Sequence, residues 1–171
     1  MALREVIKLP HPNLRKPARK VKTIDADFQK LVDDMIETMR DEPGVGLAAT
    51  QLDIPLRLIV VEYPLDDSDE NMHPSLFVVV NPEISKKSVE TEMGIEGCLS
   101  VPDIFGEVER SVSLEVNGLN RFGKKQKIKA HGWLARIFQH EIDHVNGILF
   151  VDRATQLWKR EEIESEEIGM V

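Results

Sequence analysis

The sequence predicts an α+β fold in which antiparallel or mixed sheets wrap around one central helix, with a further helix near the N-terminus. Apolar residues recur with helical spacing in two segments, and β-rich runs occupy the chain between them. The strand-like runs mostly precede the second helix, so we expect the sheets to enclose it. The 171 residues are expected to form a single domain, with residues 153–171 as a polar C-terminal extension.

The first helix is predicted over residues 25–41, where apolar side chains recur at i, i+3, i+4 and i+7. Its apolar stripe consists of Phe28, Leu31, Val32, Met35, Ile36 and Met39. Asp25 can cap its N-terminus, and the Pro43–Gly44 pair ends it. Prolines within residues 8–22 favour an extended or turning chain before this helix.

Strands are predicted at residues 56–62, 76–80, 112–116 and 125–129. The acidic stretch between the first two runs is expected to be a loop, and residues 120–123 a hairpin turn between the last two. The central helix is predicted over residues 132–146, with Gly147 as its C-terminal stop. Its core-facing residues are expected to be Leu134, Ile137, Phe138, Ile142 and Val145.

Charge and composition narrow the class of protein. The net charge of −8 argues against DNA binding, which needs a basic surface. The single cysteine, Cys98, excludes an internal disulfide and suits a reducing compartment. No apolar run approaches the length of a membrane span, and the first residues do not resemble a signal peptide, so we expect a cytoplasmic protein without membrane partners.

The predicted central helix carries the pattern H-E-x-x-H at residues 140–144. Positions i and i+4 share a helix face, so His140 and His144 can bind the same divalent metal. Glu141 lies beside the first histidine, where its carboxylate can accept a proton from water activated by the metal. The motif therefore predicts metal-assisted hydrolysis.

Two histidines leave a third protein ligand to be found. Position 150 is a phenylalanine, which excludes a third histidine six residues after His144. A glutamate about twenty residues downstream is the second common solution, and Glu161, Glu162 and Glu164 lie near that distance. Cys98, in the segment Glu-Gly-Cys-Leu-Ser, is the alternative, because a thiolate is a strong ligand for zinc or ferrous iron.

A glycine-containing segment, Gly-Val-Gly-Leu-Ala-Ala-Thr-Gln, occupies residues 44–51. It lacks the Gly-Lys-Ser/Thr of a phosphate-binding loop. Its glycines let the backbone approach a ligand closely, and Gln51 can aim its amide at developing oxyanion charge. A structural turn with a buried glutamine is the other interpretation.

Taken together, the segments GVGLAATQ, EGCLS and QHEIDH resemble the three signature motifs of peptide deformylases. The resemblance implies that Cys98, His140 and His144 bind one divalent metal, with Fe²⁺ in the cell and Zn²⁺, Ni²⁺ or Co²⁺ as substitutes. It implies that Gln51 and the backbone N–H of Leu99 stabilise the oxyanion, with Glu141 as general base and then acid. The implied substrates are nascent polypeptides with N-terminal formyl-methionine, from which formate is released.

We expect substrate contacts at Val45, Gly46, Trp133 and Ile137, because they lie beside the motifs or on the helix face of His140. Glu96 and Arg110 are expected to form an ion pair that holds the Cys98 loop. Trp133 and Phe105 depart from residues that are common in the family, which leaves the fine substrate preference open.

Only Lys159 and Arg160 precede the acidic C-terminal run, so direct ribosome docking through that end is not expected. A zinc endopeptidase with a downstream glutamate ligand remains the alternative function, and a catalytically silent metal-binding relative is a third.

Overall fold

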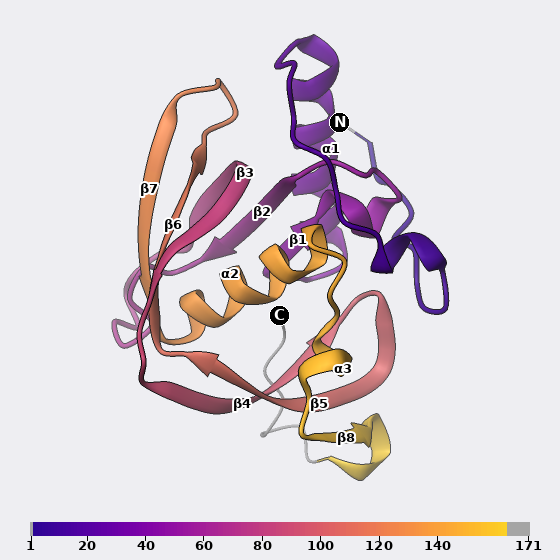
Figure 1. Cartoon of the computed structure of the whole chain (residues 1–171), viewed down its shortest axis with the longest axis vertical. Coiled ribbons are helices and arrows are strands. Elements are labelled where there is room, and N and C mark those ends of the chain that lie inside the picture. Colours follow the sequence, from indigo (N-terminus) through magenta and orange to yellow (C-terminus); the bar gives the residue numbers. More distant parts are fainter. Residues whose placement is uncertain (1, 164–171) are drawn as a thin grey trace.

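The computed structural model describes residues 2–163 (Figure 1). Its helices are α1 (Ala26–Asp41), α2 (Gly132–Val145) and the short α3 (Phe150–Arg153), with single 3₁₀ turns at Pro12–Arg15, Ala49–Leu52 and Arg160–Glu162. Its strands are β1 (Gly46–Ala48), β2 (Leu58–Tyr63), β3 (Ser75–Lys87), β4 (Thr91–Cys98), β5 (Val101–Ser111), β6 (Ser113–Leu119), β7 (Lys125–His131) and β8 (Gln156–Lys159).

The strands form two antiparallel sheets. One has five strands in the order β1-β2-β3-β6-β7, and the other has three in the order β4-β5-β8. Helix α2 runs through the centre of the molecule and contacts β1, β2, β6 and β7 of the first sheet and β5 of the second (Figure 1). The predicted α+β arrangement of sheets around a central helix is therefore confirmed.

The five-stranded sheet has an apolar layer on each face. Ile59 and Val61 of β2 pack with α2, whereas Leu58 and Val60 pack with α1. Burial on both faces explains why the first four residues of β2, Leu58 to Val61, form an unbroken apolar run rather than an alternating one. Asp25 caps α1 as predicted, because its carboxylate accepts the backbone N–H of Phe28 at 2.9 Å.

The β4–β5 hairpin was not predicted, although it forms most of the second sheet. Its strands contain glycines and charged residues, which weaken a strand pattern. Several of those charges are buried in pairs, among them Glu96 and Arg110. The Glu96–Arg110 pair itself was expected from the sequence, but the strand pattern did not reveal that the two residues lie on neighbouring strands of a hairpin.

Two other segments extend beyond the prediction. Strand β3 continues to Lys87 past an irregularity in its pairing between Val80 and Glu83, where Asn81 has φ of 53°. The expected polar extension at residues 153–171 contains β8, which pairs with β5. Residues 164–171 lie outside the described part. Within residues 2–163, no helix is both long enough and apolar enough to cross a membrane.

Candidate metal centre

Three potential metal ligands meet where the end of β4 approaches α2. The ligand atoms of Cys98, His140 and His144 all lie within 4.8 Å of one another, and all three residues are buried. Cys98 Sγ is 3.3 Å from His144 Nε2. The two histidines lie one turn apart on α2, with ring centroids 5.0 Å apart. The helix therefore provides two ligands locally, and the β4–β5 hairpin brings the third.

The donor atoms of this cluster fit a single divalent ion. His140 Nε2 is buried without a hydrogen-bond partner among the described residues, as are His144 Nδ1 and Glu141 Oε2. Buried polar atoms seldom remain unpaired, so the lone pair of His140 Nε2 is expected to bind a ligand. Tetrahedral zinc with ordinary bond lengths would place sulfur and nitrogen roughly 3.5 Å apart, close to the separation of Cys98 and His144.

Glu96 fixes the orientation of His140. Its Oε1 lies 2.9 Å from His140 Nδ1, and its two oxygens accept from Nη2 and Nε of Arg110, each at 2.9 Å. Arg110 also donates to Asp143 at 2.7 Å, and Asp143 in turn binds Arg153. A carboxylate on Nδ1 turns Nε2 toward the metal position and sets the ring tautomer. The Glu96–Arg110 pair thus contacts a metal-ligand candidate directly.

Burial is the largest single influence on the pKa values of His140, Glu141 and His144. It raises the pKa of Glu141 to about 7 and, together with the charge of His140, holds the pKa of His144 well below its ordinary value. For His140 burial acts against the charged form, but neighbouring Cys98 and Glu96 raise the pKa to about 10. A bound metal cation would take the place of that proton as the positive charge between His140 and Cys98.

Gln51 is held rigidly beside the cysteine. It lies in the 3₁₀ turn after β1, and its Oε1 accepts the backbone N–H of Ala48 at 3.0 Å. This leaves Nε2 to donate toward Cys98 Sγ at 3.6 Å and to Ser100 Oγ at 3.2 Å. Leu99 follows Cys98 in the tight turn between β4 and β5. An amide N–H therefore points to the edge of the ligand cluster.

Strand β1 passes close to Glu141. A Cβ added at Gly46 would lie 2.7 Å from Glu141 Oε1, so only glycine leaves the carboxylate in place. Among the strands of residues 2–163, β1 is also at the edge of the five-stranded sheet and pairs only with β2. An edge strand beside a reactive centre is a ready partner for an extended peptide.

The predicted pocket residues are only partly brought together. Val45 and Trp133 are half-buried against the core, whereas Ile137 is completely buried within it. Trp133 lines a small cavity of about 90 Å³. A separate cavity of about 190 Å³ lies beside Cys98, and Phe105 forms part of its wall.

The downstream glutamates do not join the ligand cluster. Glu161 and Glu162 are exposed in the last 3₁₀ turn, and Glu164 lies outside the described residues. The cluster found within residues 2–163 instead contains Cys98.

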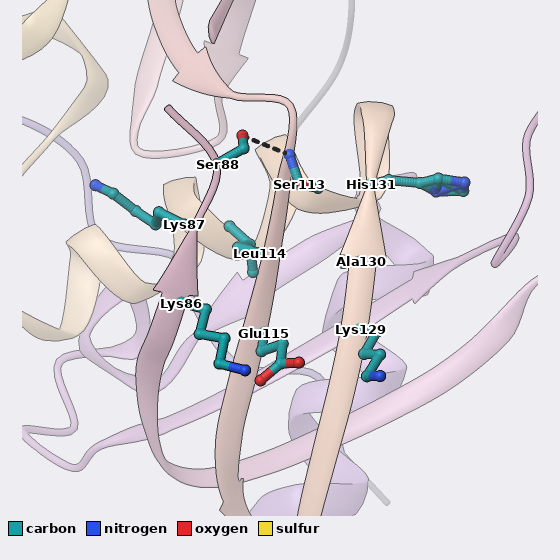
Figure 2. A pocket seen from close by; sticks show the side chains of 9 residues that line it. All are labelled: Lys86, Lys87, Ser88, Ser113, Leu114, Glu115, Lys129, Ala130 and His131. Carbon is teal, nitrogen blue, oxygen red and sulfur yellow. Dashed lines mark hydrogen bonds between the residues drawn. The ribbon is translucent and has the colours of Figure 1, made fainter. Parts of the chain in front are cut away.

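A further cavity of about 550 Å³ lies at the ends of β3, β6 and β7. Figure 2 shows two of its lysines, Lys86 and Lys129, on either side of Glu115, whereas Lys87 extends away from it. None of the three metal-ligand candidates lines it, so it is separate from the metal centre.

Sequence reasoning missed Arg136, which binds Glu96 from α2 at 2.7 Å. The available signal was a charge one helical turn before His140 on a helix whose neighbouring residues are mostly apolar.

The chain is similar to known proteins over most of its length. The family model described as polypeptide deformylase matches residues 3–160. A peptide deformylase of Rhizobium meliloti is 46% identical over 157 residues, which cover 92% of this chain and 88% of the relative.

Solved structures agree with the sequence matches. The crystal structure of peptide deformylase from Ehrlichia chaffeensis has a TM-score of 0.84 and 36% identity, covering 91% of this chain and 89% of that one. A class I type b peptide deformylase from Acinetobacter baumannii, solved with Met-Ala-Ser bound, has a TM-score of 0.81 and 39% identity, with 89% and 98% coverage. With its buried Cys-His-His cluster and its match along residues 3–160, the chain belongs to the polypeptide deformylase family.

Proposed function

We propose that this protein is a metal-dependent hydrolase that removes the formyl group from the N-terminal formyl-methionine of nascent polypeptides and releases formate. The observation that carries the proposal is the convergence of Cys98, His140 and His144 with Glu141 and Gln51 at one buried centre. Family membership supports the substrate class, and the Acinetobacter baumannii relative has been solved with a peptide that begins with methionine. Because the substrate is the nascent chain, we place the reaction in the cytoplasm.

One divalent ion would be held by Cys98, His140 and His144. We infer Fe²⁺ as the cellular metal, with Zn²⁺, Ni²⁺ or Co²⁺ able to replace it, since thiolate and imidazole bind all of these. When bound, the ion supplies Lewis acidity and lowers the pKa of water toward neutrality. The thiolate ligand makes the iron form oxidisable, so its activity is expected to decline in air faster than that of the nickel or zinc form.

Glu141 is the general base in this proposal. Its buried carboxyl, with a pKa raised to about 7, is suited both to accept a proton and to return it near neutral pH. It takes a proton from the attacking water and delivers it to the departing amine. The close passage of Gly46 keeps its carboxylate in place.

Gln51 and the backbone N–H of Leu99 stabilise the oxyanion that develops on the formyl oxygen. The amide of Gln51 is already oriented by Ala48, so it needs no reorganisation during the reaction. Arg110 acts at a distance, by holding Glu96 against His140.

The peptide is proposed to add as an extended strand along the free edge of β1 at Gly46. Val45 and Trp133 would line the space for the methionine side chain, with Ile137 packed behind them in the core. Apolar contact at this position favours methionine, and the main-chain contacts accept any following sequence.

Formate release from a formyl-Met tripeptide tests the proposal, using protein prepared anaerobically with Fe²⁺. Rapid release is expected from the wild type, with loss of turnover in both Cys98→Ala and Glu141→Ala and loss of metal only in Cys98→Ala. A fully metallated wild type that releases no formate would refute the proposal. Cleavage of unformylated peptides would favour an endopeptidase.

A further inference from the structure

We propose that Arg136 is a positioning residue for His140, acting through Glu96. The inference rests on the proposed metal ligation by His140, and it assigns a role to a buried charge that the reaction itself does not use. Arg136 lies one turn before His140 on α2, so both side chains reach the same part of the β4–β5 hairpin.

Arg136 is buried, with 4% of its surface exposed, and both of its terminal nitrogens donate hydrogen bonds. Nη1 donates to Glu96 Oε2 at 2.7 Å and to the Val108 carbonyl at 2.9 Å, while Nη2 donates to the Glu92 carbonyl at 2.8 Å. The side chain therefore connects α2 to both strands of the β4–β5 hairpin, in which Cys98 is the last residue of β4. A buried guanidinium is costly unless it is paired in this way.

The contacts of Glu96 explain why a second arginine matters. Oε1 accepts from Arg110 Nη2 and lies against His140 Nδ1, whereas Oε2 accepts from Arg110 Nε and Arg136 Nη1. A carboxylate has about four acceptor positions, so all of them are used. Arg110 binds the Glu96 carboxylate from β5, and Arg136 binds it from α2. With both present, Glu96 cannot turn away from the imidazole.

The hairpin makes room for this side chain at Gly94. A Cβ added there would lie 2.6 Å from Arg136 Cζ, so any larger residue would displace the guanidinium. On its other side the guanidinium lies 5.3 Å from the centroid of the Trp133 ring, within the range of a cation–π contact. Gly94 and Trp133 thus both lie next to the guanidinium of Arg136.

The test is the affinity of the metal-free protein for Zn²⁺, measured by competition with a chelator, together with the visible spectrum of the Co²⁺ form. In Arg136→Met, Zn²⁺ affinity is expected to fall by about 10- to 100-fold, and the Co²⁺ bands are expected to shift because the imidazole is no longer held in one orientation. Arg136→Lys keeps the positive charge but lacks the planar guanidinium, whose nitrogens bind several acceptors at once. This variant should therefore recover only part of the lost Zn²⁺ affinity.

Arg57→Met is the matched control. Arg57 donates to the Val145 carbonyl at the C-terminal end of α2 and to the Pro82 carbonyl in β3, and among the described residues it makes no hydrogen bond to Glu96. Its loss is expected to lower thermal stability without shifting the Co²⁺ spectrum. This separates the positioning of His140 from general support of the helix.

Gly94→Ala provides a second variant, because it displaces Arg136 while leaving its charge. It should weaken Zn²⁺ binding in the wild type and have little further effect in Arg136→Met, since both changes act through the same contact. Equal losses in both backgrounds, or a folded Arg136→Met with wild-type affinity and spectrum, would overturn the inference. A wild type that binds no Zn²⁺ would refute the proposed metal site and this inference with it.

Discussion

Replacing Gln51 by methionine isolates one contribution to the proposed reaction. The variant keeps the length of the side chain and removes the amide whose Nε2 lies 3.6 Å from Cys98 Sγ. Loss of one oriented oxyanion donor costs about 3 to 4 kcal/mol, so kcat for formate release should fall roughly 10²- to 10³-fold. KM and metal content are expected to change little, because the donor acts on charge that exists only in the transition state.

The substitution also has a structural cost, which must be separated from the catalytic one. Ala48 loses the acceptor of its backbone N–H, and an unpaired buried donor costs about 1–3 kcal/mol of stability. Thr50→Val is the control, since Thr50 is the buried neighbour whose hydroxyl donates to the His144 carbonyl at 3.3 Å. We expect it to lose stability but to keep most of its kcat. A metallated, folded Gln51→Met with nearly wild-type kcat would refute the oxyanion role.

Four other predictions concern the same centre. Glu141→Gln should retain metal but lose about 10²- to 10⁴-fold in kcat. Burial raises the pKa of Glu141 from 4.5 to about 7, so its contribution to the stability of the metal-free fold is full below pH 4.5 and is lost as the pH rises to about 7. Urea unfolding in chelator should therefore show the wild type losing stability relative to Glu141→Gln over that interval, and parallel curves would contradict the pKa assignment. In Gly46→Ala the added Cβ would lie 2.7 Å from Glu141 Oε1, and formate assays should show kcat lowered by roughly 10²-fold with metal retained. The stability that Glu96 contributes depends on pH in the opposite direction to that of Glu141. Burial opposes the charge of Glu96, but contacts with His140 and Arg110 hold its pKa below 4.5. Its stabilisation is present above pH 4.5 and lost below it, so unfolding curves of Glu96→Gln should depend less on acid and lie about 3–5 kcal/mol lower near pH 7.

Local features of the chain were readable from the sequence. The apolar stripe of α1, its Asp25 cap and the face shared by His140 and His144 depend on residues no more than a few turns apart, and helical periodicity links them directly. The strands of the five-stranded sheet were mostly recognisable for a similar reason, because apolar β-rich runs identify buried strands. Resemblance to a family then suggested Cys98, which periodicity alone left as one of two possibilities.

The tertiary structure decided what lies between distant segments. The β4–β5 hairpin was missed because its glycines and charged residues weaken the strand pattern, and although the Glu96–Arg110 pair was expected, the contact of Arg136 with Glu96 was not. The pairing energy of these three residues exists only when β4, β5 and α2 meet. Likewise, the burial of Ile137 and the approach of Gly46 to Glu141 depend on how strands and helix pack. The sequence by itself determined the local periodicity and the helix face shared by His140 and His144, since these follow from neighbours along the chain. The tertiary structure alone decided the orientation of His140 by Glu96 and the contact of Arg136 with Glu96, because these contacts join side chains up to 44 positions apart.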